Sequence, residues 1–190
     1  MSHVRRVRFL CCVAAVAMAV SATDAASQIS RDEALAFVYP GATFSANRLF
    51  LTAEQMKDAT ARAGEPVRTP LIARYTASVG GTVVGRAYIE THTVRTKKES
   101  LLISLDRAGK VQRVDVVAFL EPAEYLAPTP FLDQFTGRHL EDDVRLHRAI
   151  RPIAGATLTA GAVTEAVRRV LAIDEVLGAA DADRRIESGQ

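Results

Sequence analysis

Residues 71–91 read LIARYTASVGGTVVGRAYIET, and this stretch decides the fold. Strand-forming residues run from Leu71 to Val79, the pair Gly80-Gly81 follows, and a second β-prone run extends from Thr82 to Thr91. Two adjacent glycines between such runs are typical of a two-residue hairpin turn. The stretch therefore predicts two antiparallel strands that pair side by side.

Two more strands are expected immediately downstream. Ser100–Asp106 is strongly apolar and ends at the turn Arg107–Lys110, after which Val111–Leu120 alternates apolar and polar residues over part of its length. Short turns join neighbouring antiparallel strands, and prolines end regular pairing beyond Leu120. The middle of the chain thus predicts a twisted antiparallel sheet.

Helices are expected on both sides of this region. Ser30 and Glu33 have the spacing of a capping box before a helix at Arg31–Tyr39, and a second capped helix is expected from Thr52 to Arg62. The mixed segment Phe44–Phe50 between them is expected to be a loop, and Phe131–Phe135 a short helix or turn.

The last expected helix runs from Gly161 to Leu177. Apolar residues recur there at spacings of three and four, which is typical of one buried helical face; they are Val163, Val167, Val170, Leu171 and Leu177. The charged residues 179–190 are expected to form a disordered tail. The whole pattern predicts an α+β fold in a single domain, with helices flanking an antiparallel sheet.

The first 26 residues have the features of a secretory signal peptide. A basic head with Arg5, Arg6 and Arg8 precedes an uncharged run from Phe9 to Val20, followed by small residues. Cleavage sites are present after Ala22 and after Ala25, and an uncleaved membrane anchor is the alternative. A periplasmic or secreted protein is therefore expected, with a mature domain at 27–178.

Removal of this segment changes the chemistry available to the chain. Cys11 and Cys12 are the two cysteines, so cleavage leaves no thiol for disulfides, metal sites or haem attachment. A cut after Ala25 or Ala26 also removes three arginines and one aspartate, which leaves basic and acidic residues in balance. A balanced charge provides no electrostatic basis for a nucleic-acid partner.

Composition and motifs exclude several other classes. With 190 residues, of which 48% are hydrophobic, the chain can form one buried core and is not disordered.

Gly80–Arg86 superficially resembles a phosphate loop but lacks the Gly-Lys-Ser/Thr ending. His92, His139 and His147 have no metal-ligand spacing. Arg95, Lys97 and Lys98 form a basic cluster, either a solvated loop or a phosphate-facing group.

One stretch carries a more specific signal: residues 153–160 read IAGATLTA, directly before the last helix. Small residues at Gly155 and Ala156 let a bulky group approach the backbone. Hydroxyls on Thr157 and Thr159 precede a helix N-terminus, where free amides and the helix dipole favour an anion such as phosphate. The alternative is that Thr159 is a plain N-cap and Thr157 an ordinary strand residue.

This segment resembles the Ser-Gly-Ala-Thr-x-Thr/Ser motif of FMN-binding domain proteins, a family that includes flavin-carrying components of the sodium-translocating NADH:quinone reductase and of the Rnf electron-transport complex. The similarity extends to the strand-turn-strand Leu105–Val116, to Glu121–Leu126 and to Phe131–Arg138. In that family the matching threonine carries FMN through a phosphoester bond made by a flavin transferase. The resemblance therefore implies that Thr157 is the attachment residue.

The resemblance also implies a wider flavin site and a function. The implied cofactor-binding residues are Gly155, Ala156, Thr157, Leu158, Thr159, Glu121, Tyr125 and Leu126. Two positions depart from the family pattern: Arg151 replaces an Asp and Ala154 replaces a Ser or Thr, so covalent and non-covalent FMN both stay open. The alternative for Glu121 is a surface carboxylate.

The function implied is electron transfer. The resemblance implies an FMN-carrying protein with no substrate of its own, a flavin transferase that modifies it, and redox partner proteins that include membrane-bound ones. A flavin-free binding module of the same fold is the competing interpretation, and a flavin reductase or oxidase is a third.

Overall fold

The computed structural model describes the backbone of residues 28–187 and the side chains of residues 28–181. The expected signal peptide lies outside the described residues and stays a prediction. The elements in chain order are α1 (Arg31–Val38), β1 (Thr43–Phe50), α2 (Ala53–Ala63), β2 (Leu71–Val79), β3 (Thr82–Thr93), β4 (Lys98–Asp106), β5 (Val111–Phe119), η1 (Ala123–Tyr125), α3 (Thr129–Leu132), η2 (Asp133–Phe135) and α4 (Thr157–Glu187).

The five strands form one antiparallel sheet in the order β1-β2-β3-β4-β5, so every strand pairs with its sequence neighbour. Gly80 and Gly81 have φ angles of 56° and 80°, a left-handed conformation that suits the tight β2–β3 turn. The α+β single-domain prediction is confirmed.

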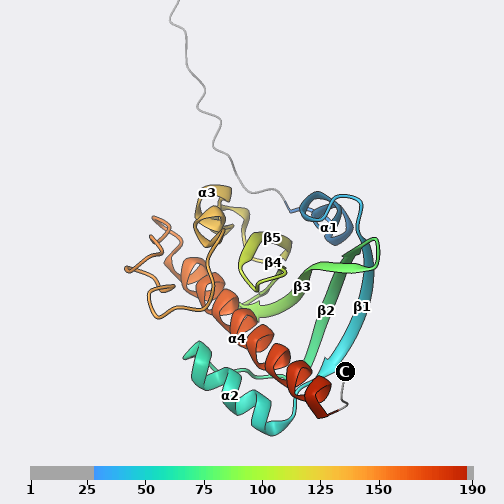
Figure 1. Ribbon diagram of the computed structural model, residues 1–190. Helices are drawn as coiled ribbons and strands as arrows, with labels where there is room; N and C mark the ends of the chain where they lie inside the picture. Colours follow the sequence, from blue (N-terminus) through green and yellow to red (C-terminus); the bar gives the residue numbers. More distant parts are fainter. Residues whose placement is uncertain (1–27, 188–190) are drawn as a thin grey trace, which may run out of the picture.

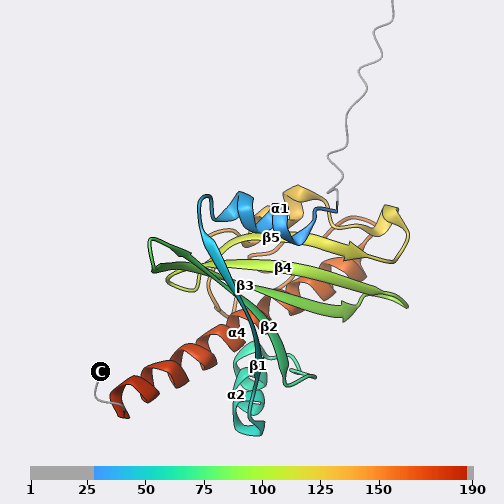
Figure 2. The same cartoon turned by 90° about the vertical axis from the view of Figure 1, so that its right-hand side faces the viewer.

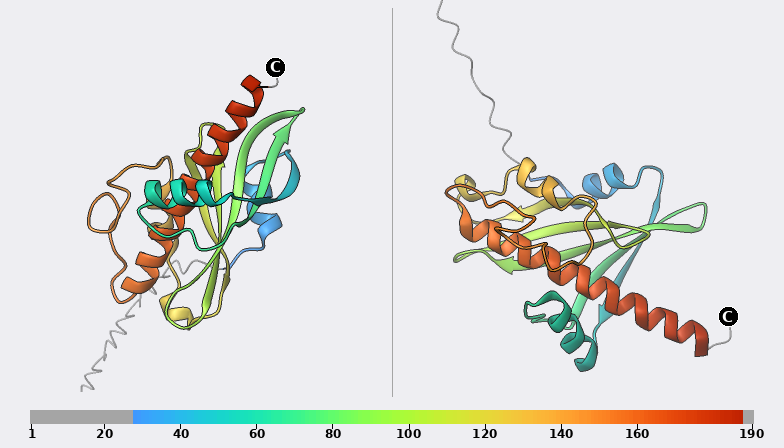
Figure 3. Two further views of the ribbon diagram at one scale, coloured as in Figure 1. Left: turned by 90° about the horizontal axis from the view of Figure 1, so that it is seen from below. Right: turned by 60° about the vertical axis from the view of Figure 1, so that its left-hand side comes forward.

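Helices cover both faces of the sheet (Figures 1 and 2). On one face, α1 buries Leu35 and Tyr39 against Ala77, Ala87 and Leu102. On the other face, α4 crosses the sheet and α2 lies beside α4, as Figure 3 shows from two further directions. The larger core fills this second interface and includes the predicted helix stripe, because Val163, Val167, Val170, Leu171 and Leu177 are all buried there.

The first two helices begin as their sequences predict. The Ser30 hydroxyl accepts a hydrogen bond from the amide of Glu33, whose carboxylate accepts one from the amide of Ser30. Thr52 and Gln55 form the same reciprocal arrangement at α2, which ends at Gly64 in the left-handed conformation.

Segment Phe44–Phe50 was expected to be a loop, and this prediction is wrong because the segment lies within β1. Strand β1 is at the edge of the sheet, and most of its residues are exposed. An edge strand with both faces open to solvent has no need for the apolar alternation that marks a half-buried strand. Its pairing with β2, from Thr43↔Ser78 to Phe50↔Leu71, holds it in place.

Helix α4 is longer at both ends than the sequence indicates. It begins at Thr157 rather than Gly161, and it continues to Glu187, so the expectation of a disordered tail is wrong for residues 179–187. Apolar periodicity ends near Leu177, where α4 leaves the core. The residues beyond that point include alanine, arginine and glutamate, which are good helix formers and favour continuation of the helix.

Candidate functional site

The segment that resembles the flavin motif forms the start of α4. The amide of Ala160 donates to the carbonyl of Ala156 (3.0 Å), which makes Ala156 the N-cap residue. An alanine side chain cannot accept a hydrogen bond from the first amides of a helix, so the cap side chain leaves the amides of residues 157–159 unsatisfied. Thr157 is the first helical residue and is exposed.

The backbone before Thr157 leaves space on its outer side. Gly155 has φ of 77°, and a Cβ atom built there would meet no atom within 4 Å. Ala154, Gly155 and Leu158 are exposed, whereas Ala156 is buried. The outer side of Gly155 is therefore open to solvent next to Thr157.

The two threonines of the motif have different environments. Both were expected to precede the helix, but they lie in its first turn. Thr159 is 1% exposed, and its hydroxyl donates to the carbonyl of Tyr125 (2.7 Å). The expectation that the Thr159 hydroxyl holds a phosphate is therefore wrong, because that hydroxyl anchors η1. Only the backbone amide of Thr159 belongs to the free amides at the helix N-terminus.

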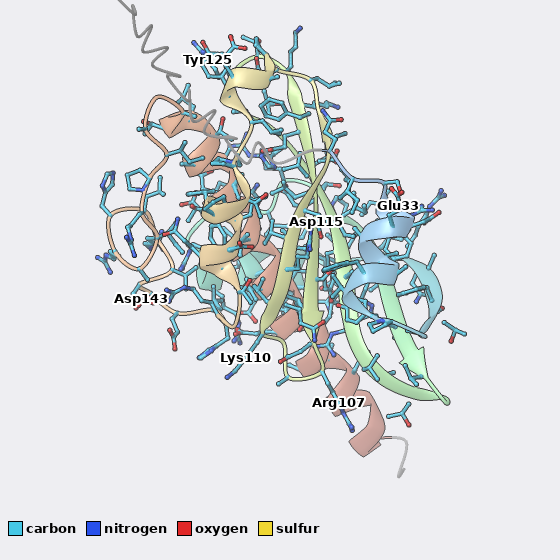
Figure 4. All side chains as sticks on the ribbon, turned by 90° about the horizontal axis from the view of Figure 1, so that it is seen from above. Glu33, Arg107, Lys110, Asp115, Tyr125 and Asp143 are labelled. Atoms are coloured by element: carbon cyan, nitrogen blue, oxygen red, sulfur yellow. The ribbon has the colours of Figure 1, made fainter. Side chains whose placement is uncertain are left out.

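Tyr125 connects the start of α4 to the β3–β4 turn. The guanidinium carbon of Arg95 lies 4.7 Å from the centroid of the Tyr125 ring, a cation–π contact. Tyr125 and Leu126 are partly buried and pack against the main core. Figure 4 labels Tyr125 at the end of the sheet nearest the beginning of α4. Of the predicted residues, Tyr125 is thus brought into contact with Thr159 in the first turn of α4.

The Glu121 side chain stabilises the β3–β4 turn. Its Oε1 atom accepts hydrogen bonds from the amides of Arg95 (3.2 Å), Thr96 (2.6 Å) and Lys97 (2.7 Å). These backbone hydrogen bonds lower the pKa of Glu121 below its ordinary value. The carboxylate therefore organises the β3–β4 turn, which carries Arg95, and no contact places it against Thr157.

The segment Phe131–Arg138 is hydrogen-bonded to the irregular segment that leads to the motif. Gln134 accepts a hydrogen bond from the amide of Arg151 (2.9 Å), and its side-chain amide donates to the Arg151 carbonyl (3.3 Å). Arg151 itself is exposed. Gln134 thus connects the segment Phe131–Arg138 to the residues just before the motif. Arg151, which replaces the Asp of the family pattern, has a solvent-facing side chain.

A cavity of about 520 Å³ begins one helical turn beyond Leu158. Its lining includes Ala162, Glu165 and Arg169 of α4, together with residues of β2, β3 and the segment 66–69. Residues four apart lie on the same side of a helix, so Leu158, which is 59% exposed, shares the face that lines the cavity. Leu158 therefore lies on the same side of α4 as the helix residues that line the cavity.

A chain of buried charges forms one wall of this cavity. Arg169 donates to Glu90 (2.6 Å), and the ring nitrogens of His92 lie 2.6 Å from Glu90 and 2.9 Å from Glu99. The Glu99 side chain is fully buried, and its Oε1 atom has no hydrogen-bond partner in the described part of the chain. Positive and negative groups thus alternate along this chain, from Arg169 of α4 through Glu90 and His92 of β3 to Glu99 of β4.

These contacts change the protonation of His92. Burial by itself lowers the pKa of the imidazole, but its hydrogen bonds to Glu90 and Glu99 outweigh burial and raise the pKa to about 9. Burial opposes ionisation of Glu90, yet hydrogen bonds from His92 and Arg169 lower its pKa below the ordinary value. His92 is therefore a cation at neutral pH.

Sequence reasoning did not identify this group. Glu90 and His92 are two residues apart and so share one face of β3, and Glu99 is the cross-strand partner of His92. The Glu-x-His spacing at the end of the strand predicted for Thr82–Thr91 was the available signal. Its pairing with Arg169 depends on how α4 crosses the sheet, which no local pattern specifies.

Among the described residues, no group of three or more His, Cys, Asp and Glu side chains is arranged to hold a metal ion. The helices within residues 28–187 include none with the length and apolar character of a bilayer span. No family model, no curated protein and no solved structure matches this chain.

Proposed function

We propose that the protein is a periplasmic FMN-binding electron carrier whose flavin is joined to Thr157 through a phosphoester bond. The observation that carries the proposal is the start of α4, where an exposed Thr157 hydroxyl follows the open backbone of Gly155 and an N-cap residue without a side-chain acceptor. The sequence resemblance supplies the identity of the cofactor.

The chemistry of these groups fits a phosphate diester. A phosphate on Thr157 would lie at the positive end of a long helix, near amides that the Ala156 side chain does not cap. Arg95 supplies a cationic group on the β3–β4 turn, in contact with Tyr125, and Leu158 supplies exposed apolar surface. Thr159 and Glu121 would act indirectly, because they fix η1 and the turn that carries Arg95.

Attachment requires a partner enzyme and an activated donor. The Thr157 hydroxyl oxygen would form the new bond to the FMN phosphorus, while a phosphoanhydride bond in the flavin donor breaks and a nucleotide leaves. The hydroxyl proton would pass to a base of the flavin transferase. Within this chain, Thr157 needs to be accessible to that enzyme, and its exposure meets this requirement.

A covalent tether suits a protein outside the cytoplasm. Micromolar affinity corresponds to about 8 kcal/mol, and such a complex loses its cofactor when free FMN is diluted below that concentration. An isoalloxazine ring supplies reversible electron transfer when it is bound. The chain's own role would be to hold the ring accessible to redox partners.

The test is co-expression with a flavin transferase, followed by acid precipitation. Wild-type protein should retain yellow colour in the precipitate, and Thr157→Ala should lose it. Thr136→Ala, which removes another exposed threonine hydroxyl, is the matched control and should keep the colour. Wild-type protein without visible flavin bands would favour the flavin-free module, and steady turnover with a soluble donor would favour a reductase or oxidase.

A further inference from the structure

The far end of α4 covers an unusual pair of arginines on the sheet. Arg74 of β2 is opposite Tyr88, and Arg86 lies two residues from Tyr88 on β3, so both arginines occupy the face that α4 covers. Asp174 of α4 accepts two hydrogen bonds from Arg86 (2.5 and 2.7 Å) and one from the Tyr88 hydroxyl (2.7 Å). Both oxygens of the Asp174 carboxylate therefore already accept hydrogen bonds from Arg86 or Tyr88.

Arg74 is less well neutralised than Arg86. Its side chain is 16% exposed, and the carboxylate of Asp181 lies 4.0 Å away. Its Nε atom is buried and has no hydrogen-bond partner among the residues that the structure describes. A buried donor without a partner costs free energy, and a neighbouring cation adds repulsion. An anion closer to Arg74 than Asp181 would relieve the repulsion between Arg74 and Arg86.

A cavity of about 570 Å³ opens beside this pair. The β4–β5 turn contributes Arg107 and Lys110 to its lining, and neither side chain forms an ion pair within residues 28–181. The turn lies close to the buried pair, because a Cβ atom on Gly109 would be only 3.2 Å from the Asp174 carboxylate. Four cationic side chains from two strands and one turn therefore surround one space.

The lining holds three acidic residues, Asp174, Glu175 and Asp181, against four basic ones, and Asp181 lies 4.0 Å from Arg74, so its cationic excess lies on Arg107 and Lys110. Asp174 is held by Arg86 and Tyr88, and Glu175 is 3.4 Å from Arg62, which lies outside the cavity lining. His139 is paired with Glu141 (2.9 Å). A cavity volume of about 570 Å³ is in the range of sites for small molecules and exceeds the space that one small inorganic ion fills.

We infer that this cavity binds a small anion with at least two negative charges on phosphate or carboxylate groups. Arginine side chains bind such groups with paired hydrogen bonds, and Lys110 adds a point charge at the rim. The cavity is separate from the proposed flavin site: Asp174 and Thr157 are 17 residues apart on one helix, which is about 25 Å. Figure 4 labels Arg107 and Lys110 at the end of the sheet opposite Tyr125.

Isothermal titration of the full mature chain with pyrophosphate and with citrate tests this inference. At least one probe should bind with one-to-one stoichiometry, and added sodium chloride should weaken the affinity. The double variant Arg107→Ala/Lys110→Ala changes only the turn and should weaken binding by about tenfold or more. Arg74→Gln should also weaken binding, since it removes the buried guanidinium but keeps a polar side chain of similar reach.

Matched controls separate a specific site from general attraction to a positive surface. Arg48→Ala/Lys57→Ala removes the same charge from positions outside the cavity lining and should leave the affinity unchanged. Thr157→Ala should leave it unchanged as well, which makes the result independent of flavin attachment. Absence of binding by both probes, or equal loss in the turn variant and the Arg48/Lys57 control, would overturn the inference.

Discussion

The Thr159 hydroxyl donates a 2.7 Å hydrogen bond to the carbonyl of Tyr125, a residue 34 positions earlier in the chain. This contact joins the first turn of α4 to η1, whose Tyr125 ring lies under the Arg95 guanidinium. The exposed Thr157 hydroxyl is therefore presented from a helix end that is fixed to the rest of the fold. Of the two threonines in the motif, one anchors the helix and the other is accessible for modification.

Replacing Thr159 with Val should separate these two roles. The variant keeps the shape of the buried side chain but removes its hydrogen bond, so the free energy of unfolding should fall by about 1–2 kcal/mol. Urea unfolding measures this change, and the exposed Thr136→Val should shift stability by less than about 0.5 kcal/mol. If Thr159→Val abolished flavin attachment while unfolding was unaffected, the structural role assigned to Thr159 would be wrong.

His92 should make stability depend on alkaline pH. Its pKa is about 9 in the folded protein, above the value of about 6.5 expected for an unfolded chain. The stabilisation from its protonated form is therefore complete below about pH 6.5 and is lost as pH rises through 9. The loss should be at most about 3 kcal/mol.

Unfolding of wild-type protein and His92→Gln between pH 6 and 10 measures this contribution. The wild-type advantage should be largest at pH 6 and should shrink as pH approaches 10. His139→Gln is the matched control, since His139 is half exposed and pairs with a surface carboxylate. A constant difference between wild type and His92→Gln across this range would contradict the raised pKa.

Gly85 should be intolerant of any side chain. A Cβ atom there would lie 2.5 Å from the Leu105 carbonyl oxygen and would overlap the Tyr39 ring. The Tyr39 hydroxyl is 2.8 Å from the carbonyl oxygens of both Arg86 and Leu105, so the ring cannot easily move away. Gly85→Ala should therefore lower the free energy of unfolding by about 2 kcal/mol or more.

The control for this variant is Gly161→Ala in α4. A Cβ atom at Gly161 would meet nothing within 4 Å, and alanine is the better helix former. Thermal or urea unfolding should show stabilisation of about 0.5–1 kcal/mol. Equal effects of the two substitutions would argue against the close packing of Tyr39 on β3.

Local sequence patterns predicted most of the fold. The strand from Leu71 to Val79 and the capping boxes at Ser30 and Thr52 appear as expected, because each depends on residues close together in sequence. Strand β1 was missed, since an exposed edge strand carries no burial pattern. The start of α4 was placed too late, because Ala156 caps it without a side-chain signal.

The candidate site was only partly predictable. The motif located Thr157, but the burial of Thr159 against Tyr125 depends on contacts between distant segments. The same is true of Glu121, which caps a turn 24–26 residues earlier in the chain. The hydrogen bonds from Arg169 to Glu90 and from Arg86 to Asp174 arise only when α4 crosses the sheet.

The most direct measurement for the central claim is peptide mapping by mass spectrometry of wild-type protein co-expressed with a flavin transferase. We expect one added FMN, less one water, on the peptide that contains Thr157, with fragment ions that place the mass on that residue and a mature N-terminus after the signal peptide. An unmodified Thr157 in protein purified alongside an active transferase, or a flavin mapped to a different residue, would contradict the account.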